Sequence, residues 1–151
     1  MRLLAALALL ALAAPAAAAS LSMANGYGAI DAPRDTDPLA LGRLFCDARI
    51  AGDMSALEKF YAPKLVRLLA AAAPDAVDWQ TYPDRPQSCA VSIVNGFDDT
   101  IGVIVEIAYT ATGRNWRDQL NLERTPRSWL LNNVFYAGGG NLRFRLVNTA
   151  P

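Results

Sequence analysis

The spacing of apolar residues changes once along this chain, and that change limits the possible fold more than any other feature. Between residues 38 and 73, apolar side chains recur every three or four positions, which is the period of an amphipathic helix. From Cys89 onward they alternate with polar side chains, which is the period of a strand with one buried face. Residues 74–88 hold three prolines and follow neither period, so we expect a long loop there. Helices followed by strands indicate the α+β class.

About three N-terminal helices are expected before this loop. Asp37 precedes Pro38 in the way that an N-cap precedes the first helical turn, and Gly52 supplies a stop. Ser55 opens an S-x-x-E capping box, which predicts a short second helix. Pro63 begins a third helix, and the prolines of the loop end it.

Four strands are expected after the loop, at residues 89–97, 101–111, 115–124 and 128–137. The connections between them are short and rich in turn residues, which forces neighbouring strands to run antiparallel. We therefore predict a curved four-stranded antiparallel sheet with the helices packed on one face. A chain of 151 residues fits one such domain, spanning residues 37–151.

The first nineteen residues have the pattern of a secretory signal peptide. A short positive start is followed by an apolar run and by small residues before Ser20. The alternative is an uncleaved membrane helix, although the run is barely long enough and is rich in weakly inserting alanine. Residues 20–36 are predicted to be a flexible lead-in. The leader predicts a periplasmic or secreted protein that is not held in a membrane after cleavage.

Two cysteines, Cys46 and Cys89, remain after the leader. An even number of cysteines in an oxidising compartment favours a disulfide, which would stabilise a loop of this length by roughly 3–4 kcal/mol. The alternative is a pair of buried free thiols, which a packed core accepts.

Charge and composition exclude several classes of function. Basic and acidic residues are equal in number, 14 of each, which excludes a general nucleic-acid binder with a strongly basic surface. The chain has no histidine, which excludes Ser-His-Asp and Cys-His catalysis and nearly every catalytic zinc site. Asp98 and Asp99 are interpreted as a solvated turn rather than a cation site, and we expect neither a metal nor a cofactor.

One strand carries a recognisable pattern. Trp129, Leu131, Val134 and Tyr136 match a Trp-x-Ile-x-Asp-Ile-x-Tyr strand, with Asn133 at the position where Asp is common. Together with the preceding order of short helices, this resembles the NTF2-like superfamily over roughly residues 37–147, and more narrowly its small secreted bacterial domains of unknown function. The resemblance implies a cone in which a bent sheet wraps around helices, with a pocket at one end. It implies no single activity.

The glycines at 138–140 stand where a phosphate-binding loop or a simple turn would place them. A phosphate loop needs a following Lys and a long helix, and neither is present, so we predict a turn off the sheet. The alternation of Leu142, Phe144 and Leu146 suits a fifth strand, whereas the resemblance implies a short C-terminal helix. We retain the helix, with Asn141 as its cap.

Carboxylate and tyrosine chemistry remains open. Asp118 shares a strand face with Trp116 and two leucines, and Tyr109 lies on the neighbouring strand. An Asp base with a Tyr donor in an apolar cavity is the arrangement of a ketosteroid-isomerase-like site. Asp118 and Tyr109 are therefore the catalytic candidates, and Trp116 and Asn133 join them as ligand-binding candidates. The alternative for Asp118 is a salt bridge at the rim of the sheet.

These observations favour a secreted or periplasmic, non-catalytic, NTF2-like binding domain. It would hold a small apolar ligand in its cone or bind a protein partner, as immunity or inhibitor proteins do. The second hypothesis is an isomerase or dehydratase that uses Asp118 and Tyr109. The third is a structural homodimer formed through the outer face of the sheet.

Overall fold

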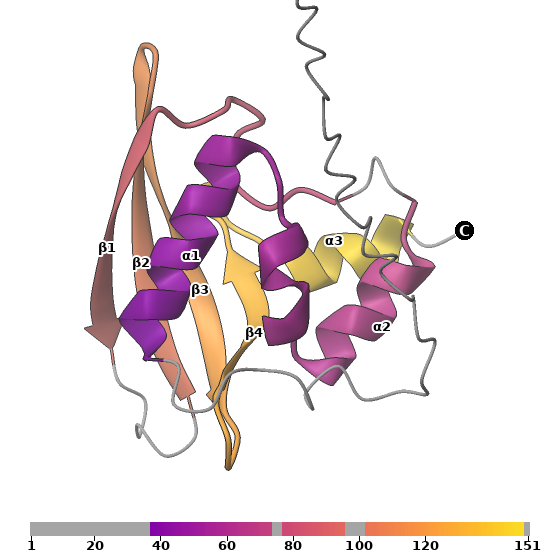
Figure 1. The fold of residues 1–151 in the computed structure, drawn as a ribbon. Coiled ribbons are helices and arrows are strands. Elements are labelled where there is room, and N and C mark those ends of the chain that lie inside the picture. Colours follow the sequence, from indigo (N-terminus) through magenta and orange to yellow (C-terminus); the bar gives the residue numbers. More distant parts are fainter. Residues whose placement is uncertain (1–36, 74–76, 96–101, 150–151) are drawn as a thin grey trace, which may run out of the picture.

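The computed structural model describes residues 37–73, 77–95 and 102–149 (Figure 1). The expected signal peptide at 1–19, the lead-in at 20–36 and the Asp98–Asp99 turn lie outside the described residues. The elements in chain order are α1 (Pro38–Ala51), the 3-10 helix η1 (Ser55–Phe60), α2 (Pro63–Ala71), β1 (Ser88–Asn95), β2 (Gly102–Ala111), β3 (Arg114–Arg124), β4 (Trp129–Phe135) and α3 (Leu142–Thr149).

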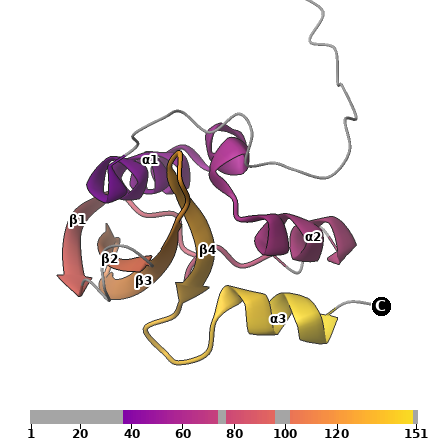
Figure 2. The same cartoon turned by 90° about the horizontal axis from the view of Figure 1, so that it is seen from below.

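The four strands form one open antiparallel sheet in the order β1-β2-β3-β4. This confirms the α+β class and the four-stranded antiparallel sheet. At one edge of the sheet, β4 is covered by two isolated bridges, from Leu131 to Tyr61 and from Phe135 to Asn141. In both views α2 and α3 lie side by side next to β4 (Figures 1 and 2). In the part of the chain that the structure describes, no helix has the length and apolar character needed to cross a bilayer.

Local signals position the first helices. The Asp37 carboxylate accepts a hydrogen bond from the Leu39 N–H at 3.1 Å, and Gly52 ends α1 with a left-handed φ of 75°. The capping box expected at Ser55 is wrong, because η1 has no side-chain cap of that kind. The Asp53 carboxylate instead accepts from the Ser55 N–H at 2.9 Å, so the residue two positions earlier performs the capping.

Helix α1 packs on the side of the sheet that carries Val91, Val105 and Ile107, named here the helix-facing side. The approach is close because Gly42 has no side chain: a Cβ added there would lie 2.6 Å from Val91 Cγ1. Directly paired residues share a face of a sheet, so the row Ala90, Ala108 and Arg117 defines the opposite side. This second side is named the outer face.

The chain leaves β4 through a glycine turn and enters a helix. Gly139 and Gly140 have φ values of 91° and 81°, which residues with a Cβ rarely adopt. The helix α3 follows, so the expected helix is confirmed and a fifth strand is not formed. Asn141 caps it by accepting from the Phe144 N–H at 2.9 Å.

Candidate functional site

The aromatic candidates lie together in the core on the helix-facing side. Tyr109 and Trp116 are directly paired across β2 and β3, and their rings stack with centroids 4.9 Å apart. Tyr82 packs edge-on against Trp116 at 5.5 Å. Tyr109 is 1% exposed and Trp116 is 5% exposed, so neither ring presents a face to solvent.

Two polar atoms of this aromatic pair lack partners. Within the described residues, neither the Tyr109 hydroxyl nor Trp116 Nε1 makes a hydrogen bond, although both atoms are buried. Burial raises the pKa of Tyr109, and the nearby Asp118 carboxylate raises it further. The phenol is therefore neutral and is suited to donate a hydrogen bond.

Asp118 is fully buried, and the salt bridge expected at the rim is wrong for this residue. Its carboxylate accepts from the Thr81 N–H at 2.9 Å, from the Thr81 hydroxyl, and from the Ala137 N–H at 3.0 Å. Two segments distant in sequence are thus fastened to the same carboxylate on β3. Asp118 acts as an anchor for the loop before β1 and for the turn after β4.

Asn133 is also engaged within the fold. Its side-chain oxygen accepts from the Arg143 N–H at 3.1 Å and from its neighbour Val134 at 3.0 Å. Its amide nitrogen donates to Asn141 Oδ1 at 3.0 Å. Asn133 and Asn141 therefore hold the first turn of α3 against β4.

A broad hollow opens over the outer face of the described sheet. This hollow of about 930 Å³ spans all four strands. It reaches the buried Tyr109 and Trp116, and its lining on the outer face includes Ser88, Ala90, Ala108, Thr110, Asn115 and Gln119. The strand register places these side chains in rows on the outer face. The small side chains of Ala90 and Ala108 lie next to each other and, with the polar residues of these rows, form the bottom of the hollow, named here its floor.

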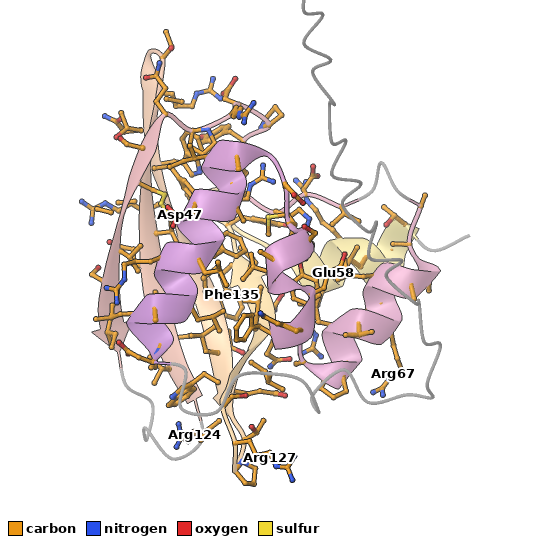
Figure 3. The ribbon with its side chains drawn as sticks, in the orientation of Figure 1. Asp47, Glu58, Arg67, Arg124, Arg127 and Phe135 are labelled. Atoms are coloured by element: carbon orange, nitrogen blue, oxygen red, sulfur yellow. A yellow bond between two sulfur atoms is a disulfide. The ribbon has the colours of Figure 1, made fainter. Side chains whose placement is uncertain are left out.

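Two larger side chains, Phe135 and Arg117, also line the hollow. Phe135, labelled in Figure 3, is 38% exposed and is paired with Gln119. Arg117 is exposed and pairs with Glu106, with Nη1 and Oε1 2.8 Å apart. The hollow therefore presents hydroxyl, amide, aromatic and guanidinium groups.

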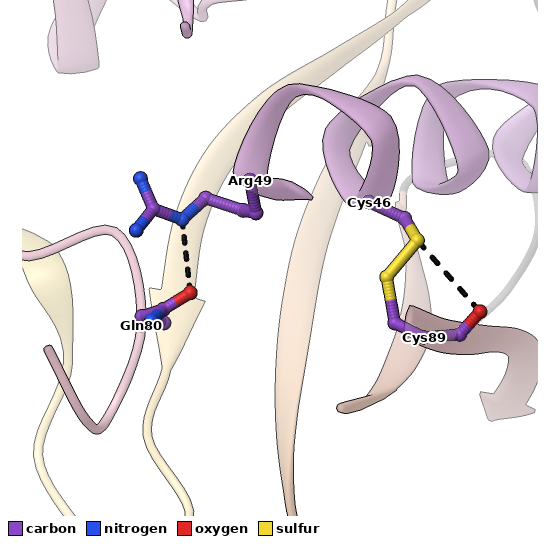
Figure 4. Close-up of a disulfide and its surroundings, with 4 residues drawn as sticks. All are labelled: Cys46, Arg49, Gln80 and Cys89. Carbon is purple, nitrogen blue, oxygen red and sulfur yellow. Dashed lines mark hydrogen bonds between the residues drawn. A yellow bond between two sulfur atoms is a disulfide. The ribbon is translucent and has the colours of Figure 1, made fainter. Parts of the chain in front are cut away.

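The loop before β1 contains residues that the sequence pattern did not single out. Gln80 is 3% exposed; its amide nitrogen donates to the Tyr82 and Asp84 carbonyls, and its oxygen accepts from Arg49 Nε at 2.9 Å (Figure 4). Burial lowers the pKa of Arg49. Thr81, described above, is the other missed residue. The proline-rich composition predicted a loop, but it did not predict that Gln80 and Thr81 bond this loop to Arg49 and Asp118.

The disulfide Cys46–Cys89 is present and joins α1 to β1, so the alternative of two free thiols is wrong (Figure 4). The Cα atoms of the two cysteines are 6.1 Å apart. Among the residues that the structure describes, no group of three Cys, Asp or Glu side chains is arranged to hold a metal ion.

Comparison of the chain with protein-family models, with curated proteins and with solved structures finds no match. The assignment of a function therefore rests on the residues and the geometry above.

Proposed function

We propose that this chain is an exported, non-catalytic binding domain of the NTF2-like type, and that it recognises a protein partner through the hollow on the outer face of its sheet. One observation carries the proposal: Asp118 and Tyr109 are buried on the helix-facing side, whereas the hollow of about 930 Å³ opens over the outer-face rows of all four strands.

The bonding of Asp118 supports a non-catalytic role. A general base needs a free acceptor within reach of the proton that it abstracts. The Asp118 carboxylate already accepts hydrogen bonds from Thr81 and Ala137, and its exposed fraction is 0%. A substrate would have to displace both the loop and the turn to reach it.

The NTF2-like type is supported by the Trp-x-Leu-x-Asn-Val-x-Tyr strand and by the short helix that follows it. The way in which the sheet curves beside α1 in Figure 2 is compatible with the cone that this resemblance implies. Export is supported by the apolar leader and by the Cys46–Cys89 disulfide, since disulfides persist in oxidising compartments.

The chemistry of the hollow favours a protein partner over a small apolar ligand. Small apolar ligands prefer enclosed sites lined mainly by apolar groups. This hollow is broad, and Ser88, Thr110 and Asn115 give its floor hydrogen-bonding groups, with Phe135 at its side. Polar groups around an aromatic anchor are typical of protein interfaces. We propose that this chain acts as an immunity- or inhibitor-like protein, and that its partner is a target protein whose functional surface it blocks.

The second candidate remains an isomerase or dehydratase that uses Asp118 and Tyr109. The observation in its favour is the Tyr109 hydroxyl, a buried donor without a partner among the described residues. It is the weaker candidate because Asp118 is 0% exposed and is not part of the hollow's lining, although the hollow reaches Tyr109.

Site-specific photo-crosslinking of the mature chain in the exported fraction of living cells tests the proposal. A benzophenone amino acid at Thr110 or Asn115, within the hollow, is expected to form one discrete adduct with a different protein. The same group at Lys64, an exposed position on α2, is expected to form none. Ala90→Arg, at an exposed position of the floor, should abolish the Asn115 adduct without changing the circular dichroism spectrum.

Absence of an adduct at both hollow positions would contradict the proposal. So would an equal yield at Lys64, or an Asn115 adduct that survives Ala90→Arg. An adduct with twice the mass of the chain reports self-association and does not count in favour of a distinct partner.

A further inference from the structure

The two edges of the sheet differ in how they are covered. The β4 edge carries the bridges to Tyr61 and Asn141. The β1 edge has no partner strand among the described residues, and β1 is the outermost element on its side in Figure 1. A free edge presents backbone N–H and C=O groups that can pair with another strand.

The side chains of β1 do not oppose such pairing. Its eight residues, SCAVSIVN, contain neither a charge nor a proline. Proteins usually protect a free edge with lysine, proline or a short strand. Here Ile93 is 48% exposed and Val94 is 50% exposed, which adds apolar surface beside the unpaired backbone.

Helix α1 adds a pair of opposite charges along the same edge. Arg43 and Asp47 are exposed, lie four residues apart, and line a groove of about 310 Å³ together with Cys89 and Val91. Figure 3 labels Asp47 on the side of α1 that lies toward β1. Asp47 makes no ion pair within the described residues, and Arg43 reaches Asp37 only at 4.0 Å.

The helix and the strand present themselves as one rigid unit. The disulfide fixes Cys46 to Cys89, and the backbone at Gly42 lies against Val91. From Gly42 to Cys46 the helix advances by about 6 Å, and the strand covers about the same distance backwards from Val91 to Cys89, so α1 runs antiparallel beside β1.

We propose that the β1 edge binds the β1 edge of a second copy of this chain. The strands pair antiparallel about a two-fold axis and extend the sheet to eight strands. The same axis sets the two α1 helices antiparallel, so that Arg43 of each copy faces Asp47 of the other. A row of opposite charges that complements itself under a two-fold rotation selects a second copy over an unrelated strand.

This inference rests on no part of the proposed function. Edge pairing leaves the outer face open, so the hollows of both copies remain accessible. It also places the dimer contact at the edge of the sheet, whereas the sequence suggested the outer face.

Sedimentation equilibrium of the mature chain over a range of concentrations tests the inference by a charge swap. The wild-type chain is expected to dimerise. Arg43→Glu alone, or Asp47→Arg alone, places like charges opposite each other at two symmetric contacts and should raise the dimer Kd roughly tenfold or more. The double variant Arg43→Glu/Asp47→Arg restores the complementarity and should return the Kd to near the wild-type value. Lys64→Glu on α2 is the matched control and should leave it unchanged.

A second variant addresses the strand itself. The axis that sets Arg43 opposite Asp47 passes level with Cys89 and Ala90 of β1. Ala90→Lys therefore puts a lysine near its own copy across the axis and should raise the Kd, because like charges on paired strands repel. A chain that stays monomeric at the highest attainable concentration would overturn the inference, whether its own residues or another protein cover the edge. A dimer that is insensitive to both single reversals and to Ala90→Lys would overturn it as well.

Discussion

Asp118 is the one fully buried carboxylate among the described residues, and it connects strand, loop and turn. A buried carboxylate is stable only when hydrogen bonds compensate for its loss of water. Thr81 and Ala137 supply those bonds. The burial of the Asp118 side chain therefore depends on the positions of the loop and the turn, and these positions depend on Asp118. The residue that most resembled a catalytic base is therefore a structural anchor in this conformation.

Replacement of this anchor should be costly. Asp118→Asn turns one acceptor into an N–H₂ group that faces existing donors, so we expect a loss of about 2–4 kcal/mol in the free energy of unfolding. Urea denaturation measures it. Glu106→Gln is the matched control: its carboxylate pairs with an exposed arginine, and the change should stay below about 1 kcal/mol. Equal losses for the two variants would refute the anchor role.

Gly42 determines how closely α1 approaches the sheet. A methyl group there would collide with the γ-carbons of Val91 and Val105, which are short and stiff. Gly42→Ala gains about 1 kcal/mol of helix propensity but strains the packing, so we expect a net loss of about 1–2 kcal/mol in urea unfolding. Val91→Ala makes room, and the loss from Gly42→Ala should shrink in that background. Additive effects would contradict the close approach.

At the scale of elements, the disulfide determines how α1 and β1 behave together. Cys46 and Cys89 are 43 residues apart, and closing that loop is expected to contribute about 4 kcal/mol by restricting the unfolded chain. Reduction with dithiothreitol should therefore shift the urea midpoint downward by a corresponding amount. The Cys46→Ala/Cys89→Ala chain should already lie at the lower midpoint and should not respond to the reductant. A response by that variant would assign the effect to something other than the bridge.

The elements that follow from local pattern could be predicted, and those that depend on distant contacts could not. Alternation in β2 and β3 identified which side chains lie in the core, because strand geometry alone sets that period. Asp118 was placed on the correct face, but its partner Thr81 is 37 residues away and lies in a loop without a period. The hollow could not be predicted without the register of two strand pairs, since only that register brings Ser88, Thr110 and Asn115 into one row.

The molecule as a whole should lose stability in alkali. Burial raises the pKa of Tyr61, Tyr109 and Tyr136 above the ordinary value of 10.0. Above about pH 10 the unfolded chain releases these protons while the folded chain keeps them, so the unfolded state binds fewer protons and stability falls as pH rises. Each tyrosine adds a slope of about 1.4 kcal/mol per pH unit above that point.

Tyr109→Phe isolates one of these contributions. The variant removes a buried hydroxyl without a partner among the described residues, so its stability at pH 7 should lie within about 1 kcal/mol of wild type. Between pH 10 and 11.5 its stability should fall less steeply than that of the wild-type chain. Parallel pH profiles of the two chains would show that Tyr109 ionises in the folded state.

The central claim is that recognition takes place on the outer face because the helix-facing side is closed. The indole N–H resonance of Trp116, assigned with Trp116→Phe, reports on that interior directly. In the mature protein this resonance should exchange slowly with D₂O and should keep its position when cyclohexanol or decanoate is added in excess. Rapid exchange together with a saturable shift on adding either probe would contradict the account, because it would show an interior that admits ligands beside Asp118 and Tyr109.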